Sequence, residues 1–140
     1  MKICLMVTLS LMHGYSFSID TLKVEEEIFN KINSYRVENG KSKLKYSSQM
    51  VQACRNHSIY MSINGKLEHV KSLREVNASA EIIQYNYTLG RTELEIGQDV
   101  LDIFIESLPH KKIIDSDYKE ISVGVHITAD EDIWVTIRFN

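Results

Sequence analysis

The stretch Val100-Leu-Asp-Ile-Phe-Ile-Glu-Ser-Leu-Pro-His110 contains the only proline of the chain, directly before a histidine. Apolar residues recur at the helical interval up to this point: Ile96, Val100, Phe104 and Leu108. This spacing predicts a helix with one buried face. A proline disfavours helical geometry in the residue before it and suits the first turn of a new helix, so we expect a short helix to begin at Pro109. His110 would then lie on a corner between two rigid elements, where side chains can face a cleft.

The C-terminal end of the chain has the pattern of a β-hairpin. Apolar residues alternate with other residues over 121–127 and again over 133–139, and the acidic residues 130–132 separate the two runs. Alternation of this kind predicts two antiparallel strands joined by a turn.

Two amphipathic helices are predicted upstream. The first would be capped by Asp20 or Thr21 and end at Asn39-Gly40, and the second would be capped by Ser47 or Ser48 and end at Asn64-Gly65. Residues 66–79 lack a sustained period and predict an irregular loop that contains His69, and residues 80–85 predict a strand that contains Glu81. Helices first and antiparallel strands last indicate an α+β domain in which helices cover the faces of a small antiparallel sheet.

The N-terminal residues 1–18 resemble a secretory signal peptide. They begin with one lysine, continue with a short apolar run and end in Ser16-Phe17-Ser18. The run is too short to span a bilayer comfortably, and an uncleaved anchor or a buried first helix is the alternative. We therefore expect cleavage near Ser18, a single domain over residues 19–140, no transmembrane segment after cleavage, and a secreted or extracytoplasmic location, periplasmic or extracellular.

Composition narrows the class of partner. The chain has 140 residues, of which 44% are hydrophobic and 25% charged, as is usual for one globular domain. Without Lys2, 15 basic side chains remain against 19 acidic ones, and no basic patch emerges, so we expect no nucleic-acid partner. Cys54 is the only cysteine in residues 19–140 and lies on the apolar stripe of the second helix, which indicates a core residue. His57 lies on the same stripe and is interpreted as a packed histidine whose ring is hydrogen-bonded.

The commonest catalytic and phosphate-binding motifs are missing. The sequence has no glycine-rich phosphate loop, no CxxC pair, no His-Glu-x-x-His and no Gly-x-Ser-x-Gly. His69, Glu81 and His110 remain as dispersed candidates, because two imidazoles can bind zinc in an open site while a carboxylate orients a ring or a water.

The order and spacing of several short motifs resemble the CAP superfamily, which includes cysteine-rich secretory proteins, antigen 5 and plant pathogenesis-related proteins. In the first half these motifs are Tyr35-Arg36, Asn39-Gly40, Leu44-Lys45, Asn64-Gly65, His69 and Ala80-Glu81-Ile82. In the second half, Ser107-Leu-Pro-His110 and Ile121-Ser-Val-Gly-Val125 look like the bacterial branch, with its Ser-Pro-Gly-His and Gly-Val-Gly-Val patterns. The resemblance covers roughly residues 24–140 and implies a three-layer α-β-α sandwich.

The resemblance also implies a cleft. His69 and His110 match the two cleft histidines of the family, and Glu81 matches its first cleft glutamate. The second glutamate is replaced by Ser107, and Glu106 beside it points about 100° away around a helix. Three further positions depart from the family pattern: Ile82, Phe104 and Ser122.

We predict a secreted CAP-type binding module without an established catalytic activity. Its cleft histidines, His69 and His110, would bind zinc weakly, with water completing the shell, and the partner would be a small ligand, a lipid or an extracellular protein. Two alternatives stay open. One is a metal-assisted hydrolase of peptides or esters that uses a histidine or Glu81 as general base, and the other is a lipid-binding cell-envelope protein with a vestigial cleft.

Overall fold

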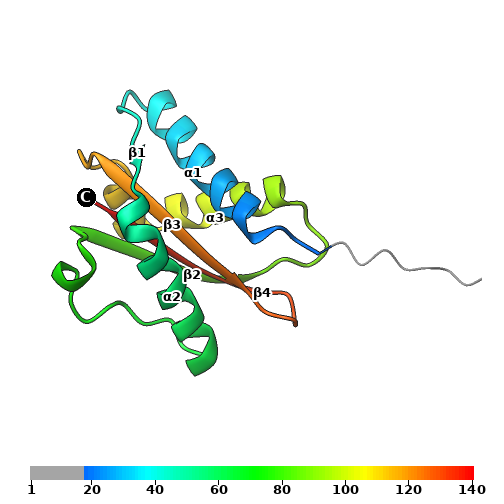
Figure 1. Ribbon diagram of the computed structural model, residues 1–140. Helices are drawn as coiled ribbons and strands as arrows, with labels where there is room; N and C mark the ends of the chain where they lie inside the picture. Colours follow the sequence, from blue (N-terminus) through cyan, green and yellow to red (C-terminus); the bar gives the residue numbers. More distant parts are fainter. Residues whose placement is uncertain (1–17) are drawn as a thin grey trace, which may run out of the picture.

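The computed structural model describes residues 18–140, so the predicted signal peptide lies outside the described residues except for its last position (Figure 1). The elements are α1 (Thr21–Glu38), β1 (Lys45–Tyr46), α2 (Ser48–Asn64), η1 (Arg74–Val76), β2 (Ala80–Tyr87), α3 (Glu93–Glu106), α4 (Leu108–Ile114), β3 (Glu120–Ile127) and β4 (Asp132–Phe139). Over residues 18–140, no helix combines the length and the hydropathy needed to cross a bilayer.

The ends of the first two helices lie where the capping residues predict them. The Asp20 carboxylate accepts hydrogen bonds from the backbone amides of Leu22 and Lys23, which would otherwise have no partner at the start of α1. The left-handed conformation of Gly65, with φ of 62°, ends α2. The start of α1 and the end of α2 therefore lie within one residue of the positions that the sequence predicts.

The sheet has the strand order β1-β3-β4-β2. Its centre is the predicted hairpin, with β4 antiparallel to both β3 and β2. The prediction of an antiparallel sheet is therefore correct for these three strands. The sheet as a whole is mixed, because β1 pairs in parallel with β3 over Lys45 and Tyr46, in a segment that the sequence pattern placed in a link between helices.

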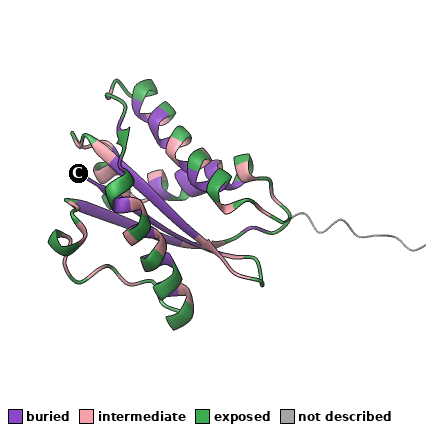
Figure 2. Ribbon diagram, in the orientation of Figure 1, coloured by how far each residue is buried: buried purple, intermediate pink, exposed green. Residues whose placement is uncertain are grey.

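Helices cover both faces of the sheet and form the predicted three layers. Helices α1 and α3 pack against each other on one face, and α2 lies across the other face (Figure 1). The strands are buried through most of their length, whereas the outward sides of the helices are exposed (Figure 2). Because both faces are covered, polar residues of the strands that point toward α2 are buried as well and must find partners there.

Helix α2 approaches β3 most closely at Gly124. A Cβ atom at this position would lie 2.2 Å from the backbone nitrogen of Arg55, so only glycine fits. The Ser58 hydroxyl donates to the Gly124 carbonyl oxygen over 2.9 Å, and Cys54 is fully buried nearby. Its full burial confirms that Cys54 is a core residue, and burial raises the pKa of the thiol to about 12.

The corner around Pro109 forms as predicted, with one correction. Helix α3 ends at Glu106, Ser107 is the N-cap of α4, and His110 lies in the first turn of α4. Leu108, which the periodicity assigned to the buried face, is exposed because the chain turns at Ser107 and the helical phase restarts.

Candidate functional site

Glu81 is a buried carboxylate whose two oxygens are both engaged. Its side chain is only 1% exposed and lies directly opposite Arg138 of β4 in the sheet register. Oε2 accepts a hydrogen bond from Nε of Arg138 over 2.9 Å and forms an ion pair with Nη2 of the same residue, also over 2.9 Å. Oε1 accepts from the backbone amide of Val70 over 2.9 Å and from Nδ1 of His69 over 3.0 Å. The carboxylate is therefore held as a fixed anion.

His69 receives a defined orientation from Glu81. A carboxylate paired with a guanidinium is ionised and accepts hydrogen bonds only, so the ring proton of His69 lies on Nδ1. The second ring nitrogen, Nε2, then keeps its lone pair, and the side chain is 59% exposed. Metal-binding histidines commonly have this arrangement, in which a carboxylate fixes the tautomer and leaves the other nitrogen available.

His110 lies close to the same region on α4. Its ring packs edge-on against Phe104 of α3, with ring centroids 5.3 Å apart. Burial lowers the pKa of His110, and the charge of His69 lowers it further. His110 is consequently a neutral imidazole at pH 7, the form that can donate a lone pair.

Buried Arg36 on α1 holds the end of α4 that follows His110. Its guanidinium donates to the carbonyl oxygens of Ile114 and Ser116, the latter over 2.8 Å, and to Ser42 over 2.9 Å. Helix α4 is thus tied to α1 at one end and begins at the Ser107 cap at the other.

The backbone groups of Ser107 are hydrogen-bonded within the turn between α3 and α4. Its carbonyl oxygen accepts from the Lys111 amide over 2.8 Å, and its amide donates to the Phe104 carbonyl over 3.3 Å. Among residues 18–140, no hydrogen bond joins Ser107 to His69, Glu81 or His110, so Ser107 lies in the corner without a hydrogen bond to the Glu81 network.

His57 confirms its interpretation as a packed histidine with a satisfied ring, and it also borders the site. It is buried, its Nε2 donates to the Glu68 carbonyl oxygen over 2.7 Å, and its ring stacks on Tyr60. The same nitrogen is 4.0 Å from Glu81 Oε1. A surface hollow of about 340 Å³ opens beside it, lined by His57, Tyr60, Glu68, His69, Val70, Lys71, Ser72 and Glu75.

Arg138 is the member of the Glu81 network that the sequence pattern does not single out. It was assigned only to the alternation of the last strand, yet it is 1% exposed and supplies the positive charge that fixes Glu81. Two features of the sequence indicate a buried pair. An arginine lies inside a strand whose other residues are largely apolar, and a glutamate lies inside another strand; such residues are rarely buried unless they are paired.

The side chains around His69 fit a metal site that is completed by water better than a site with four protein ligands. Within the described residues 18–140, no group of three His, Cys, Asp or Glu side chains is arranged to hold a metal ion. Glu81 cannot act as a ligand without leaving Arg138, because both of its oxygens are occupied. His69 and His110 are the two imidazoles that could bind a metal here, and they would leave its remaining positions to water or to a ligand.

The chain is similar to known proteins in sequence pattern and in fold. The model of the cysteine-rich secretory protein family, CAP, matches residues 29–139. No curated protein matches the chain significantly. An outer surface protein from Borrelia burgdorferi has a similar structure, with a TM-score of 0.69 and 16% identity, over 87% of this chain and 96% of that one.

Two further solved structures contain a similar domain within longer proteins. They are an extracellular protein containing a SCP domain from Bacillus anthracis, with a TM-score of 0.64 and 16% identity, and a cysteine-rich secretory protein from Staphylococcus aureus, with 0.60 and 15%. Each match covers 86% of this chain but only 41% and 39% of those proteins. At such identities these structures show the fold alone. Because the family model matches most of the sequence, the chain belongs to the cysteine-rich secretory protein (CAP) family.

Proposed function

We propose that the protein is an extracytoplasmic binding domain in which His69 and His110 hold a zinc ion whose remaining coordination positions face solvent. The hydrogen bond from His69 Nδ1 to the buried carboxylate of Glu81 is the observation that carries this proposal. It leaves the Nε2 lone pair free on an exposed ring, and His110 supplies a second imidazole whose pKa is lowered by burial.

The proposed site is weak and sensitive to pH. Two imidazoles with water completing the shell bind zinc less tightly than four protein ligands do. Each imidazole must be neutral to bind, so protons compete with the metal and binding weakens as the pH falls. When bound, zinc would supply a Lewis-acidic position that an oxygen or nitrogen atom of a ligand could occupy.

The geometry argues against Glu81 as the general base of a hydrolase. A general base needs a lone pair that can reach water, but both Glu81 oxygens already accept hydrogen bonds inside the protein and the side chain is almost fully buried. Glu81 is therefore a positioning residue for His69 in this proposal.

Zinc titration by calorimetry tests the proposal. The chain, at pH 7.5, should give a binding isotherm that is lost in His69→Ala and in His110→Ala and that weakens at least tenfold at pH 5.5. His126→Ala is the matched control, because His126 is a half-buried histidine on β3 and should leave the isotherm unchanged. An isotherm that survives in both site variants would refute the assignment.

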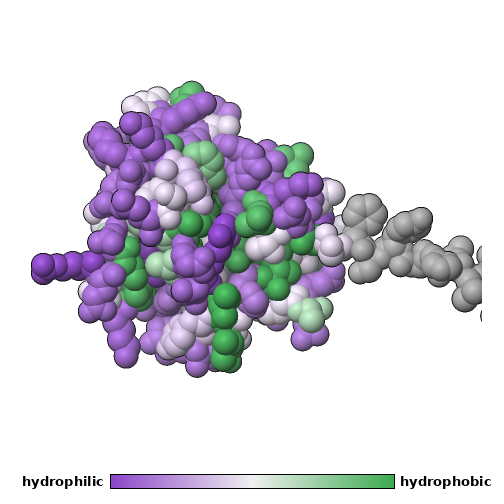
Figure 3. Space-filling model, viewed as in Figure 1, coloured by the Kyte–Doolittle hydropathy of each residue, from purple (hydrophilic) through white to green (hydrophobic). Residues whose placement is uncertain are grey.

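A second candidate, binding to lipid surfaces, is favoured by one observation. Helix α2 exposes Ile59, Tyr60 and Ile63, which lie on one side of the helix at the interval of one turn, and Tyr60 lines the hollow beside His69. Hydrophilic side chains cover most of the face shown in Figure 3, with a few hydrophobic patches between them. Cosedimentation with phosphatidylcholine vesicles that is lost in Ile63→Ser and kept in His69→Ala would support this function, and no cosedimentation of the parent would exclude it.

The location is proposed on two grounds. The N-terminal pattern of residues 1–18 is that of a signal peptide, and the similar structures are described as an outer surface, an extracellular and a secretory protein.

A further inference from the structure

The two edges of the sheet, β1 and β2, are protected very differently. A strand at the edge of a sheet presents unpaired N–H and C=O groups to which another strand can bind. Natural proteins block such edges with short strands, charges, prolines or bulges, so an edge without any of these features indicates a partner.

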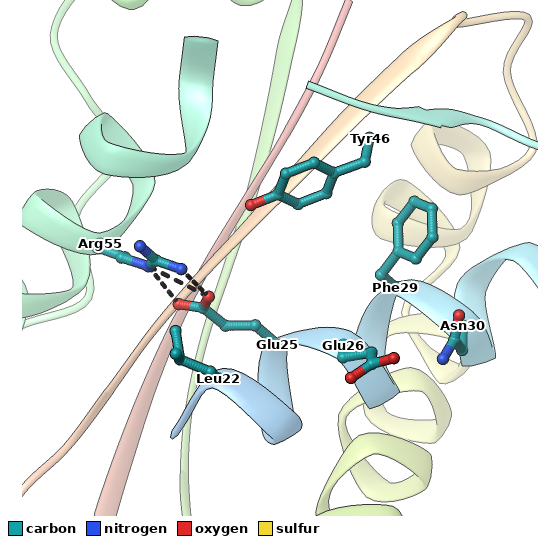
Figure 4. Close-up of a pocket in the computed structure, with 7 residues that line it drawn as sticks. All are labelled: Leu22, Glu25, Glu26, Phe29, Asn30, Tyr46 and Arg55. Atoms are coloured by element: carbon teal, nitrogen blue, oxygen red, sulfur yellow. Dashed lines mark hydrogen bonds and ion pairs between the residues drawn. The ribbon is translucent and has the colours of Figure 1, made fainter. Parts of the chain in front are cut away.

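The edge formed by β1 and β3 is closed. Strand β1 has only two residues, of which Lys45 is charged and exposed. Farther along β3, the Val125 amide donates to Glu25 Oε1 over 3.1 Å, so a side chain takes the place of a neighbouring strand. Arg55 holds the Glu25 carboxylate with contacts of 2.6 and 2.9 Å, as Figure 4 shows.

The edge formed by β2 is long and regular. Its eight residues pair continuously with β4, from Ala80 opposite Phe139 to Tyr87 opposite Asp132, without a bulge. Its main neighbour is β4, followed by α4. The segment Ile82-Ile-Gln-Tyr-Asn-Tyr87 contains no charge, proline or glycine, which is the composition that natural edge strands avoid.

The register determines which backbone groups of β2 point outward. Thr88 donates to Glu131 over 2.8 Å at the end of the β2–β4 ladder, so the even-numbered residues of β2 bond to β4. The odd-numbered residues Ile83, Tyr85 and Tyr87 then direct their amides and carbonyls away from β4. Ile83 is 8% exposed, Tyr85 is half-buried and Tyr87 is exposed. Among residues 18–140, none of these groups has a hydrogen-bond partner in another segment.

We propose that β2 pairs in antiparallel fashion with β2 of a second copy of the chain, about a twofold axis at Tyr85. The outward groups lie on alternate residues, and pairing of Tyr85 with its own copy places Ile83 opposite Tyr87 in both directions. About six backbone hydrogen bonds then form, and all outward groups of Ile83, Tyr85 and Tyr87 are satisfied.

The side chains favour a second copy over a charged partner. The paired segment is uncharged, so two copies do not repel each other. The facing pairs are Tyr–Tyr and Ile–Tyr, which stabilise antiparallel strands, together with Gln84–Asn86. Tyr87, at 44% exposure, gains cover from Ile83 of the second copy. One strand pair buries less area than a stable interface of about 1,200 Å² or more, so the dimer is weak, with a Kd of roughly 10–1,000 μM.

Sedimentation equilibrium and hydrogen exchange on the chain test this pairing. We expect dimer to accumulate between about 10 μM and 1 mM. Over the same range, the amides of Ile83, Tyr85 and Tyr87 should become protected, whereas the amides of Ile82, Gln84 and Asn86 should be protected at every concentration. This alternation distinguishes edge pairing from any other mode of association.

Two proline variants provide a matched comparison. Tyr87→Pro removes an outward amide of β2 without removing a bond to β4, and it should lower the dimer association constant at least tenfold. Tyr46→Pro is the control, since Tyr46 is a similarly exposed tyrosine on the other edge, where Lys45 and Ser47 bond to β3, and it should leave association unchanged. Tyr87→Lys, which keeps every backbone bond, replaces Tyr87→Pro if the proline variant does not fold.

Three results would overturn the proposal. They are a monomer over the whole concentration range, a dimer that Tyr87→Pro and Tyr87→Lys leave intact, and a β2 edge that binds an extended peptide of another protein while the chain itself remains monomeric. None of these variants touches His69 or His110, so the outcome is independent of the zinc proposal.

Discussion

His69 Nδ1 lies 3.0 Å from Oε1 of Glu81, and the other oxygen of that carboxylate is bound by Arg138. An exposed histidine is thus oriented by an ion pair that joins two neighbouring strands. The loop that carries His69 has little regular structure, so its position depends on this pair and on the hydrogen bond from the Val70 amide to the same oxygen. The stability of the sheet and the geometry of the site are therefore linked.

Replacement of Glu81 by Gln should lower the free energy of unfolding by about 3 kcal/mol, because the guanidinium of Arg138 would remain buried without its counter-charge. Urea unfolding followed by circular dichroism measures this change. The double variant Glu81→Leu with Arg138→Met should recover most of the loss, since replacing a buried pair by apolar groups is often neutral. A single variant as stable as the parent would show that the pair contributes nothing.

Gly124→Ala should destabilise the fold by about 3 kcal/mol or more, because its Cβ would lie within 2.5 Å of backbone and side-chain atoms of Cys54 and Arg55. Gly40→Ala is the control. Its φ is 72° with no atom within 4 Å of the added Cβ, so the cost should be only about 1 kcal/mol of conformational strain. Equal midpoints of thermal unfolding in the two variants would contradict the close approach of α2 to β3.

The pKa of His110 predicts how stability changes with pH. Burial and the nearby His69 lower this pKa in the folded state, so the unfolded chain, with a histidine pKa of about 6.5, binds the proton first as the pH falls. This contribution to stability is complete above about pH 6.5 and is lost as the pH falls toward the folded-state pKa. Unfolding of His110→Gln should show a shallower decline between pH 7 and 5 than the parent. A parental slope in His110→Gln would contradict the prediction.

Glu25→Ala should lower the free energy of unfolding by about 1–3 kcal/mol, because the Val125 amide would be buried without an acceptor and Arg55 would lose its partner. Glu26→Ala, one residue along α1 and exposed, should change stability by less than about 0.5 kcal/mol. The same denaturant titration serves both variants. Similar losses in the two would mean that the Glu25 bond does not protect the edge of β3.

The parts of the fold that the sequence predicted correctly have local signals. Asp20 caps α1 through amides two and three residues away, Gly65 ends α2 by its own conformation, and the last two strands alternate over short runs joined by a short turn. Pro109 likewise indicates the turn after α3, because its ring disfavours helical geometry in the preceding residue. In each case the residues that determine the structure are neighbours in the chain.

The parts that were missed depend on distant residues. Strand β1 exists because Lys45 and Tyr46 meet Glu120 and Ile121, and two residues are too few to show alternation. The candidate site could be assembled only by resemblance to a family, since His69 and Arg138 meet through Glu81 across two strands. Zinc binding by His69 and His110 stays a prediction.

The most direct test of the proposed site is the tautomer of His69, measured by long-range ¹H–¹⁵N correlation spectra of the histidine rings at pH 7.5 with and without zinc. We predict that neutral His69 carries its proton on Nδ1, and that zinc shifts the Nε2 resonance of His69 together with a ring nitrogen of His110 while His57 and His126 stay unchanged. A proton on Nε2 of His69, or zinc-induced shifts that spare His69 and His110, would contradict the central claim that Glu81 orients His69 for metal binding.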